Sequence, residues 1–258
     1  MITDVATFIG GYAFRHLDAR SPEWLVAQMD RLGIDQAWVG HLPSILYRDP
    51  TPGTAALARA LEPFRNRLCP VPTVNPDAPR WEDDLNFASL IDAPAVRVYP
   101  TWQGVESTSA VMRELVAAAA AIEMPLLFTV RLEDARQRHP RDVAPQLPAA
   151  AIRFGVRQHP DVRILVSNAD RAFIEEVHFG LTPVEAARVL WDIGWVWGPP
   201  EDHLRTLIET VGLERFVFGT GMPLRIPDGA VAKLDLLDLV PEERELITAG
   251  NLRSWRRG

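Results

Sequence analysis

The sequence has little cysteine, no basic run and no long apolar segment, and each absence excludes a class of protein. Cys69 is the only cysteine among 258 residues, so an intrachain disulfide and a cysteine zinc site are both excluded. The longest fully apolar run, residues 115–122, is too short to span a bilayer. Residues 2–5 carry no basic stretch leading into an apolar one, so we expect no secretory signal. A cytoplasmic protein without membrane association is therefore expected.

The charge balance argues against a general nucleic-acid binder. The formal net charge is −7, and no cluster of lysine and arginine supplies the basic surface that phosphates require. Hydrophobic residues make up 47% of the chain and charged residues 24%, which is ordinary for a domain that buries a large core. The length also suits one eight-fold α/β barrel.

Short β-branched runs alternate with longer helical patterns, which is typical of strand-helix units around a parallel sheet. The helical patterns carry start signals such as Ser21-Pro22-Glu23 and the capping box of Thr182 and Glu185. A doubly wound sheet is disfavoured because Gly10-Gly11 does not match a phosphate-binding glycine loop. We predict an α/β fold, a single (β/α)8 TIM barrel in one domain over residues 1–258. The eight predicted strands are residues 2–8, 34–40, 68–75, 95–99, 126–131, 162–168, 189–195 and 216–219.

Two motifs carry a resemblance to a known family. The first strand contains Asp4-Val5-Ala6-Thr7-Phe8, and the last reads Phe218-Gly219-Thr220-Gly221-Met222-Pro223. The pattern resembles the amidohydrolase-related family, once called amidohydrolase family 2, over nearly the whole chain. That family usually opens Asp-x-His-x-His and ends its last strand Phe-Gly-Ser-Asp-x-Pro. The resemblance implies a TIM barrel with its chemistry at the carboxyl ends of the strands.

The positions that would bind metal in the family do not carry metal ligands in this sequence. They are Ala6, Phe8, Thr129, Asn168 and Gly221. Divalent metals need several imidazole or carboxylate ligands from different strands, so we predict neither a metal nor another cofactor. A different site, built from His41, Asp192 and another carboxylate, would lack any recognisable ligand spacing.

Arginines recur at the predicted strand ends. Arg97, Arg131 and Arg225 are candidate substrate-binding residues, with Arg15 in the first loop. The planar guanidinium suits a carboxylate or phosphate, so these residues predict a small acidic ligand. Arg97 and Arg131 share the strand phase that points inward. The alternative is that each arginine pairs with a neighbouring acid. The acids considered are Glu133, Asp134 and Asp170.

Two residues are candidates for catalysis. His41 follows the second strand and can exchange protons near neutral pH, and Asp192 lies in the seventh strand. The alternative for His41 is a hydrogen bond that orders its loop. For Asp192 it is a hydrogen bond to a neighbouring loop. Asn168, which occupies a histidine position of the family, is a further candidate for binding substrate.

Aromatic residues accompany these candidates. Tyr99 and Trp102 follow the fourth strand, and Trp195 and Trp197 follow the seventh. They could wall an apolar pocket, or simply pack beneath loops. Residues 194–200 have the glycine and proline composition of a lid.

Two functions are compatible with these residues. The first is a metal-independent hydrolase, lactonase or isomerase acting on a small, carboxylate-bearing substrate of aromatic or lactone type. In the family, pyrone dicarboxylate lactonases work without metal and hold substrate acids with arginines. The second is a catalytically inactive relative that binds a small ligand or a protein partner. Homo-oligomer formation is compatible with either.

Overall fold

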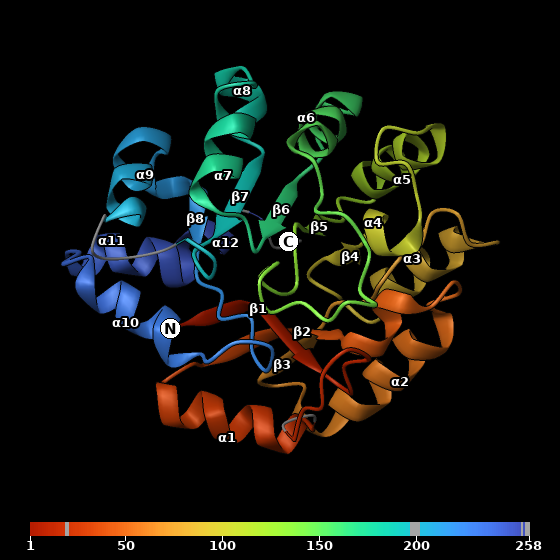
Figure 1. The fold of residues 1–258 in the computed structure, drawn as a ribbon, viewed down its shortest axis with the longest axis horizontal. Helices are drawn as coiled ribbons and strands as arrows, with labels where there is room; N and C mark the ends of the chain where they lie inside the picture. Colours follow the sequence, from red (N-terminus) through yellow and green to blue (C-terminus); the bar gives the residue numbers. More distant parts are fainter. Residues whose placement is uncertain (19–20, 197–201, 254, 256–258) are drawn as a thin grey trace.

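Eight parallel strands form the centre of the molecule, and helices surround them (Figure 1). The computed structural model describes residues 1–18, 21–196, 202–253 and 255. The strands are β1 (Thr3–Ile9), β2 (Gln36–His41), β3 (Leu68–Pro70), β4 (Val96–Val98), β5 (Leu126–Thr129), β6 (Ile164–Ser167), β7 (Val189–Asp192) and β8 (Phe216–Val217). They confirm the eight predicted strands, although most are shorter. In β3 the reason is Pro70 and Pro72, which offer no amide hydrogen to a sheet.

The strands form two sheets, in the orders β1-β2-β3 and β4-β5-β6-β7-β8, and backbone hydrogen bonds join them into a ring. At one seam the Arg97 amide donates to the Pro72 carbonyl at 2.7 Å, and the Val74 amide donates to Arg97 at 2.9 Å. At the other, the Val5 amide donates to the Phe218 carbonyl and the Gly221 amide to the Ala6 carbonyl. Both seams are bonded, so the predicted barrel fold is confirmed.

The helices cover the outside of this ring. Ser21 caps the first, as its sequence predicts, by accepting a hydrogen bond from the Trp24 amide, and Gly33 ends it in a left-handed conformation. None of the described helices is long and apolar enough to cross a membrane. The helices are α1 (Pro22–Leu32), α2 (Thr51–Leu61), α3 (Trp81–Leu90), α4 (Pro100–Gln103), α5 (Ala110–Ala121), α6 (Ala149–Gln158), α7 (Arg171–His178), α8 (Pro183–Ala186), α9 (His203–Val211), α10 (Asp228–Leu236), α11 (Pro241–Glu245) and α12 (Asn251–Arg253).

Alternating strand residues divide the interior into layers. Val96, Val98 and Phe128 pack outward against the helices, while Leu127 and Leu165 pack inside the ring. A third apolar cluster, which we call the mouth cluster, lies at the carboxyl ends of the strands, with members at or after the ends of β1, β2, β4, β5 and β8. Its buried members are Phe8, Tyr12, Leu17, Leu42, Ile45, Tyr99, Leu132 and Leu224.

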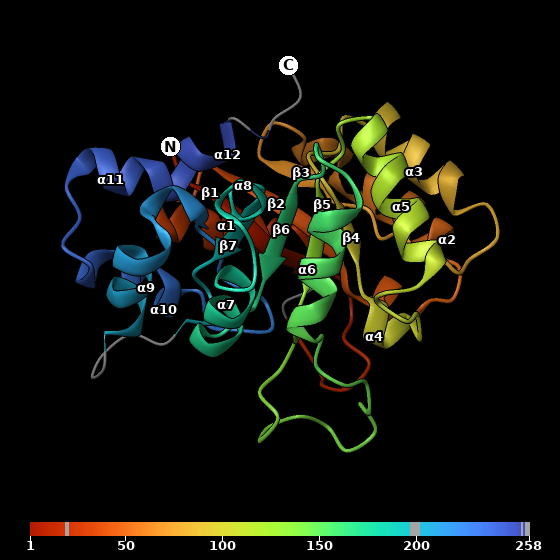
Figure 2. The same ribbon diagram turned by 90° about the horizontal axis from the view of Figure 1, so that it is seen from above.

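The loop between β5 and α6 extends away from the body of the barrel (Figure 2). Arg138 holds it together by donating two hydrogen bonds, at 2.8 and 2.7 Å, to Asp142. The Trp102 indole donates to the same carboxylate at 3.2 Å and so ties the loop to α4. This loop forms one wall of the cavities described below.

Candidate functional site

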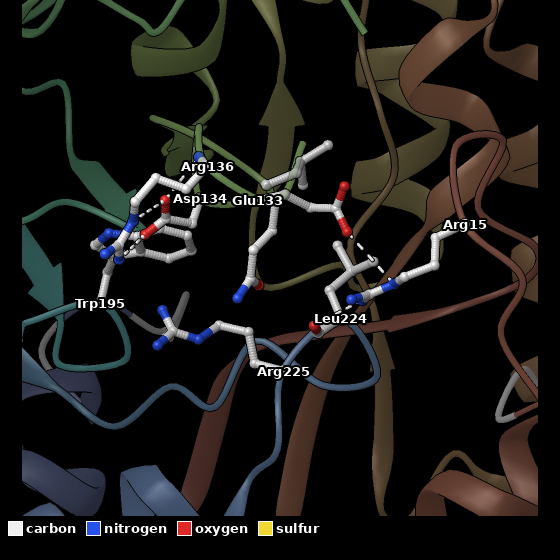
Figure 3. A pocket seen from close by; sticks show the side chains of 9 residues that line it. Arg15, Glu133, Asp134, Arg136, Trp195, Leu224 and Arg225 are labelled. Atoms are coloured by element: carbon white, nitrogen blue, oxygen red, sulfur yellow. Dashed lines mark hydrogen bonds and ion pairs between the residues drawn. The ribbon is translucent and has the colours of Figure 1, made fainter. Parts of the chain in front are cut away.

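Two neighbouring cavities of about 120 Å³ and 290 Å³ lie where β5, β7 and β8 end. They share Leu132, Glu133, Asp134 and Trp195 in their walls, and we call them together the rim pocket. Side chains from the loops after β1, β5, β7 and β8 converge on it (Figure 3). This is the end of the barrel at which TIM-barrel enzymes place their chemistry.

Trp195 forms the wall between two arginines. The Arg225 guanidinium carbon lies 4.2 Å from the centre of its ring, and that of Arg131 lies 5.4 Å away. Both arrangements are cation–π contacts, which favour a flat, rigid wall. The predicted substrate-binding residues Arg131, Arg225 and Trp195 are thus brought together, from three different strand ends.

The arginines of the rim pocket differ in their partners. Arg131 forms an ion pair with Asp170 at 2.7 Å, and Arg15 lies 3.4 Å from Glu133, so the alternative of pairing with acids is found for these two. Arg225 has no ion pair within the described part of the chain, and its Nη1 is buried without a hydrogen-bond partner. Burial lowers its pKa, with only partial compensation from Asp192 and Asp134. An unpaired cation of this kind is suited to an external anion.

Gly221 makes room for this arginine. The residue has a φ of +76°, and a Cβ atom there would lie 3.0 Å from Cδ of Arg225. An aspartate, which the family resemblance leads one to expect here, would be strained in its backbone and crowded by Arg225. The residue that removes a metal ligand therefore also accommodates the unpaired guanidinium.

Arg97 and Tyr99 point inward, but they lie outside the rim pocket. Arg97 is fully buried above the Phe8 ring, 4.5 Å from its centre, and donates to the Val5 carbonyl at 2.9 Å. Its Nε and Nη1 atoms and the Tyr99 hydroxyl have no well-aligned hydrogen-bond partner. Burial raises the pKa of that hydroxyl, although the side chains of Arg97 and Thr129 lie close enough to it to act in the opposite direction. The mouth cluster separates both side chains from solvent.

Asp192 and Asn168 are buried and joined by a hydrogen bond at the ends of β7 and β6. The Asp192 carboxylate accepts hydrogen bonds from the amides of Asn168, at 3.0 Å, and Gly194, at 2.8 Å. Burial raises its pKa, and these two bonds oppose the rise. The Asn168 side chain donates to the Arg131 carbonyl at 2.7 Å, with Asn168 itself at a φ of +60°. Both residues thus fix the backbone on which the rim pocket is built.

His41 lies on another side of the barrel mouth. Its Nδ1 is 2.8 Å from the Ser44 hydroxyl, its ring contacts Tyr47, and it is absent from the walls of the rim pocket. Burial lowers its pKa, which favours the neutral imidazole. The hydrogen bond to Ser44 corresponds to the alternative role of His41 considered above, which is to order its own loop.

Glu133 is a rim-pocket residue that the sequence brought up only as a partner for arginine. Its side chain is 7% exposed, and burial raises its pKa despite the nearby Arg15. Asp134 differs, because hydrogen bonds from Arg136 hold its pKa below the usual range. The signal in the sequence was the acid pair Glu133-Asp134, which Leu132 separates from Arg131. Trp197 and residues 198–200, which are part of the predicted lid over residues 194–200, lie outside the described residues.

A metal centre of the family type does not fit these residues. The Thr129 hydroxyl is 3.0 Å from that of Ser167, Asn168 is bonded as above, and Ala6, Phe8 and Gly221 offer no donor. No group of three His, Cys, Asp or Glu side chains suited to a metal occurs among the residues that the structure describes. We therefore derive no chemical step through a metal.

Comparison with solved structures gives barrels of the same architecture. A dihydroxybenzoic acid decarboxylase from a Polaromonas species, with bound manganese and 2-nitroresorcinol, has a TM-score of 0.76 at 12% identity, covering 98% of this chain and 96% of that one. A 2,6-dihydroxybenzoate decarboxylase from Rhizobium has a TM-score of 0.73 at 13% identity, and 98% of each chain is covered.

A probable 2-pyrone-4,6-dicarboxylic acid hydrolase from Acinetobacter baumannii, with citric acid bound, has a TM-score of 0.68 at 9% identity, with 98% of each chain covered. These similarities confirm the predicted amidohydrolase-like barrel at the level of the fold. No protein-family model and no curated protein matches the sequence.

Proposed function

We propose that the rim pocket binds a small carboxylate-bearing molecule, with its acid on Arg225 and a flat part against Trp195. The supporting observation is the partly buried Arg225 guanidinium that lines a cavity without a carboxylate partner among the described residues. A buried cation is costly unless it is paired, so a bound acid would relieve that cost. The neighbours in fold are compatible with this ligand class, since they include enzymes named for dihydroxybenzoate and pyrone dicarboxylate.

The same pocket supports proton transfer without a metal. Glu133 has a pKa raised by burial and lines both cavities, so it could exchange a proton with a bound ligand. Lactone hydrolysis and isomerisation both need such a group. We assign Asp192 a supporting role, because its two oxygens hold the amides of Asn168 and Gly194. His41 stays a prediction with no contact to this pocket.

A non-catalytic binding protein is the second candidate. The closed mouth cluster favours it, since the barrel axis, where the family resemblance places the metal, is filled by Phe8 and Tyr99. Turnover separates the two candidates. Hydrolysis or isomerisation of a bound acid that is lost in Glu133→Gln, while binding persists, would support the enzyme.

The binding proposal is tested with aromatic mono- and dicarboxylates and their neutral amides, measured by thermal unfolding. A ligand at a hundred times its Kd stabilises the native state by about 2.7 kcal/mol. Arg225→Gln should weaken acid binding by about tenfold or more, because a hydrogen bond to a charged group contributes about 1.5–3 kcal/mol.

The matched control is Arg136→Gln. Arg136 lines the same pocket, but it has its own partner, Asp134, and is largely exposed. Such surface pairs contribute about 1 kcal/mol or less, so its effect on binding should be small. Equal binding of acids and amides, or an unchanged affinity in Arg225→Gln, would overturn the proposal.

A further inference from the structure

Arg131 leaves one edge of its guanidinium without a partner. Its Nη1 atom forms the ion pair with Asp170 at 2.7 Å, and Asp170 is its only ion-pair partner within the described residues. The Nε and Nη2 atoms are buried and have no hydrogen-bond partner. These two atoms donate in nearly the same direction from the planar group, so together they can hold both oxygens of one carboxylate.

Two other arginines on the same loop show how this edge binds an acid. Arg136 donates from Nε and Nη2 to the two oxygens of Asp134, at 2.9 and 2.8 Å. Arg138 donates from the same two atoms to Asp142, at 2.8 and 2.7 Å. Arg131 has the same donors, but its acid lies at Nη1. The remaining edge is therefore suited to a carboxylate that the described part of the chain does not supply.

Arg131 and Arg225 both belong to the walls of the rim pocket. Arg131 lines the cavity of about 290 Å³, and Arg225 lines the neighbouring cavity of about 120 Å³. Their guanidinium carbons lie 5.4 and 4.2 Å from the centre of the same Trp195 ring, so their separation cannot exceed these two distances together. A benzene ring that carries two carboxylates is long enough to bridge that span.

The acids of the rim pocket leave the free edge of Arg131 open to a second negative group. Asp134 is bound by Arg136, and Glu133 lies 3.4 Å from Arg15. Burial raises the pKa of Glu133, which disfavours its negative charge. Buried donors without an acceptor are costly, so ligand oxygens at this edge would be favourable.

We propose that Arg131 is a second carboxylate site of the rim pocket, so that the pocket selects a rigid dicarboxylate. One acid binds Arg225, and the other binds the Nε and Nη2 atoms of Arg131. This inference rests on the proposed function, because Arg225 and Trp195 supply the first site and the flat wall. An amide in place of the second acid would bind less well, since it offers one oxygen and no charge to an edge with two donors.

The test compares isophthalate and terephthalate with their own monoamides by isothermal titration calorimetry. Each pair shares the ring and the first acid and differs only in the second group. We expect one of the two dicarboxylates to bind about tenfold or more tightly than its monoamide, because hydrogen bonds between charged groups are the stronger ones. If the monoamides bind and neither dicarboxylate binds more tightly, the second site is wrong and the proposed function stands. If none of the four compounds binds, the proposed function is wrong and the second site fails with it.

Arg131→Gln should remove the preference for the dicarboxylate, while the monoamide still binds through Arg225. The matched control is Arg136→Gln, which should keep the preference, because Asp134 already occupies the same edge of that arginine. A preference that survives in Arg131→Gln would overturn the assignment of the second site.

Asp170→Asn tests the site even where Arg131→Gln fails to fold. Asp170 caps α7 by accepting a hydrogen bond from the Phe173 amide, and asparagine caps helices equally well. The variant removes the negative charge from Arg131, so the preference for the dicarboxylate should increase by about threefold or more. An unchanged or smaller preference would show that the second acid does not bind Arg131.

Discussion

Each half of the barrel mouth contains an arginine with unpaired donors, but only one of the two arginines borders a cavity. On the side of β1 to β4, Arg97 has unpaired donors and is fully buried, with its guanidinium against the Phe8 ring. On the side of β5 to β8, Arg225 has an unpaired donor that borders a cavity and stacks on Trp195. The closed half is filled by packed side chains, whereas the open half has space for a ligand. Access, rather than residue type, therefore separates a structural arginine from a candidate binding arginine.

The largest expected effect is the loss of stability when Phe8 in the closed half is truncated. Truncating a buried phenylalanine removes apolar contacts and leaves a cavity, which costs about 3–5 kcal/mol. We expect Phe8→Ala to lower the free energy of unfolding in urea by that amount, with acid binding in the rim pocket retained. Trp102→Leu, a partly buried side chain beside the same cluster, is the control and should cost less. A loss below 1 kcal/mol would mean that the closed half is not a packed core.

The next effect concerns Asp4, at the seam between β1 and β8. Its carboxylate accepts hydrogen bonds from the Thr220 hydroxyl and from the amides of Ala6 and Thr220, yet burial raises its pKa from 3.8 to about 6. The native state therefore binds more protons than the unfolded state between these values, and stability must fall as the pH rises through this window. The full contribution is about 3 kcal/mol, at 1.36 kcal/mol for each unit of pKa.

Asp4→Asn should remove this decrease of the free energy of unfolding with rising pH. Urea unfolding of both proteins from pH 4 to pH 7 measures the difference, and the contribution of Asp84, a buried acid that does not interact with Asp4, cancels in it. Parallel curves for the two proteins would show that Asp4 stays ionised across this range.

The sequence predicted the barrel well because the strand-helix alternation and the two end motifs are local patterns. It also predicted the inward phase of Arg97, because side chains alternate along a strand. Arg131 lies beyond β5, which ends at Thr129, so its strand phase stays a prediction. The same rule explains the place of His41. A Cβ atom on Gly40 would lie 3.1 Å from Nε of Arg97, so Gly40 faces the barrel axis and His41 faces away from it.

The rest of the site depends on contacts between distant segments. The seal over Arg97 needs Leu42 and Ile45 from the loop after β2 to meet Phe8 from β1. The burial that raises the pKa of Glu133 depends on the irregular loop after β5. Neither arrangement has a periodic pattern in the sequence, so strand phase alone could not distinguish the closed half from the open one.

The smallest expected effect is the change in the free energy of unfolding of Arg97→Met, a variant that tests directly whether the closed half holds an anion. The guanidinium has one hydrogen bond, to Val5, and two nitrogens without a partner, so its burial gains little to offset the lost hydration. Replacing buried charges with apolar residues of similar volume is often neutral or stabilising. We therefore expect the free energy of unfolding to change by about 1 kcal/mol or less, and acid binding to stay unchanged. A loss of about 3 kcal/mol or more, the cost of breaking a buried pair, would show that Arg97 has an anionic partner inside the barrel, and the closed half would then be a second binding site.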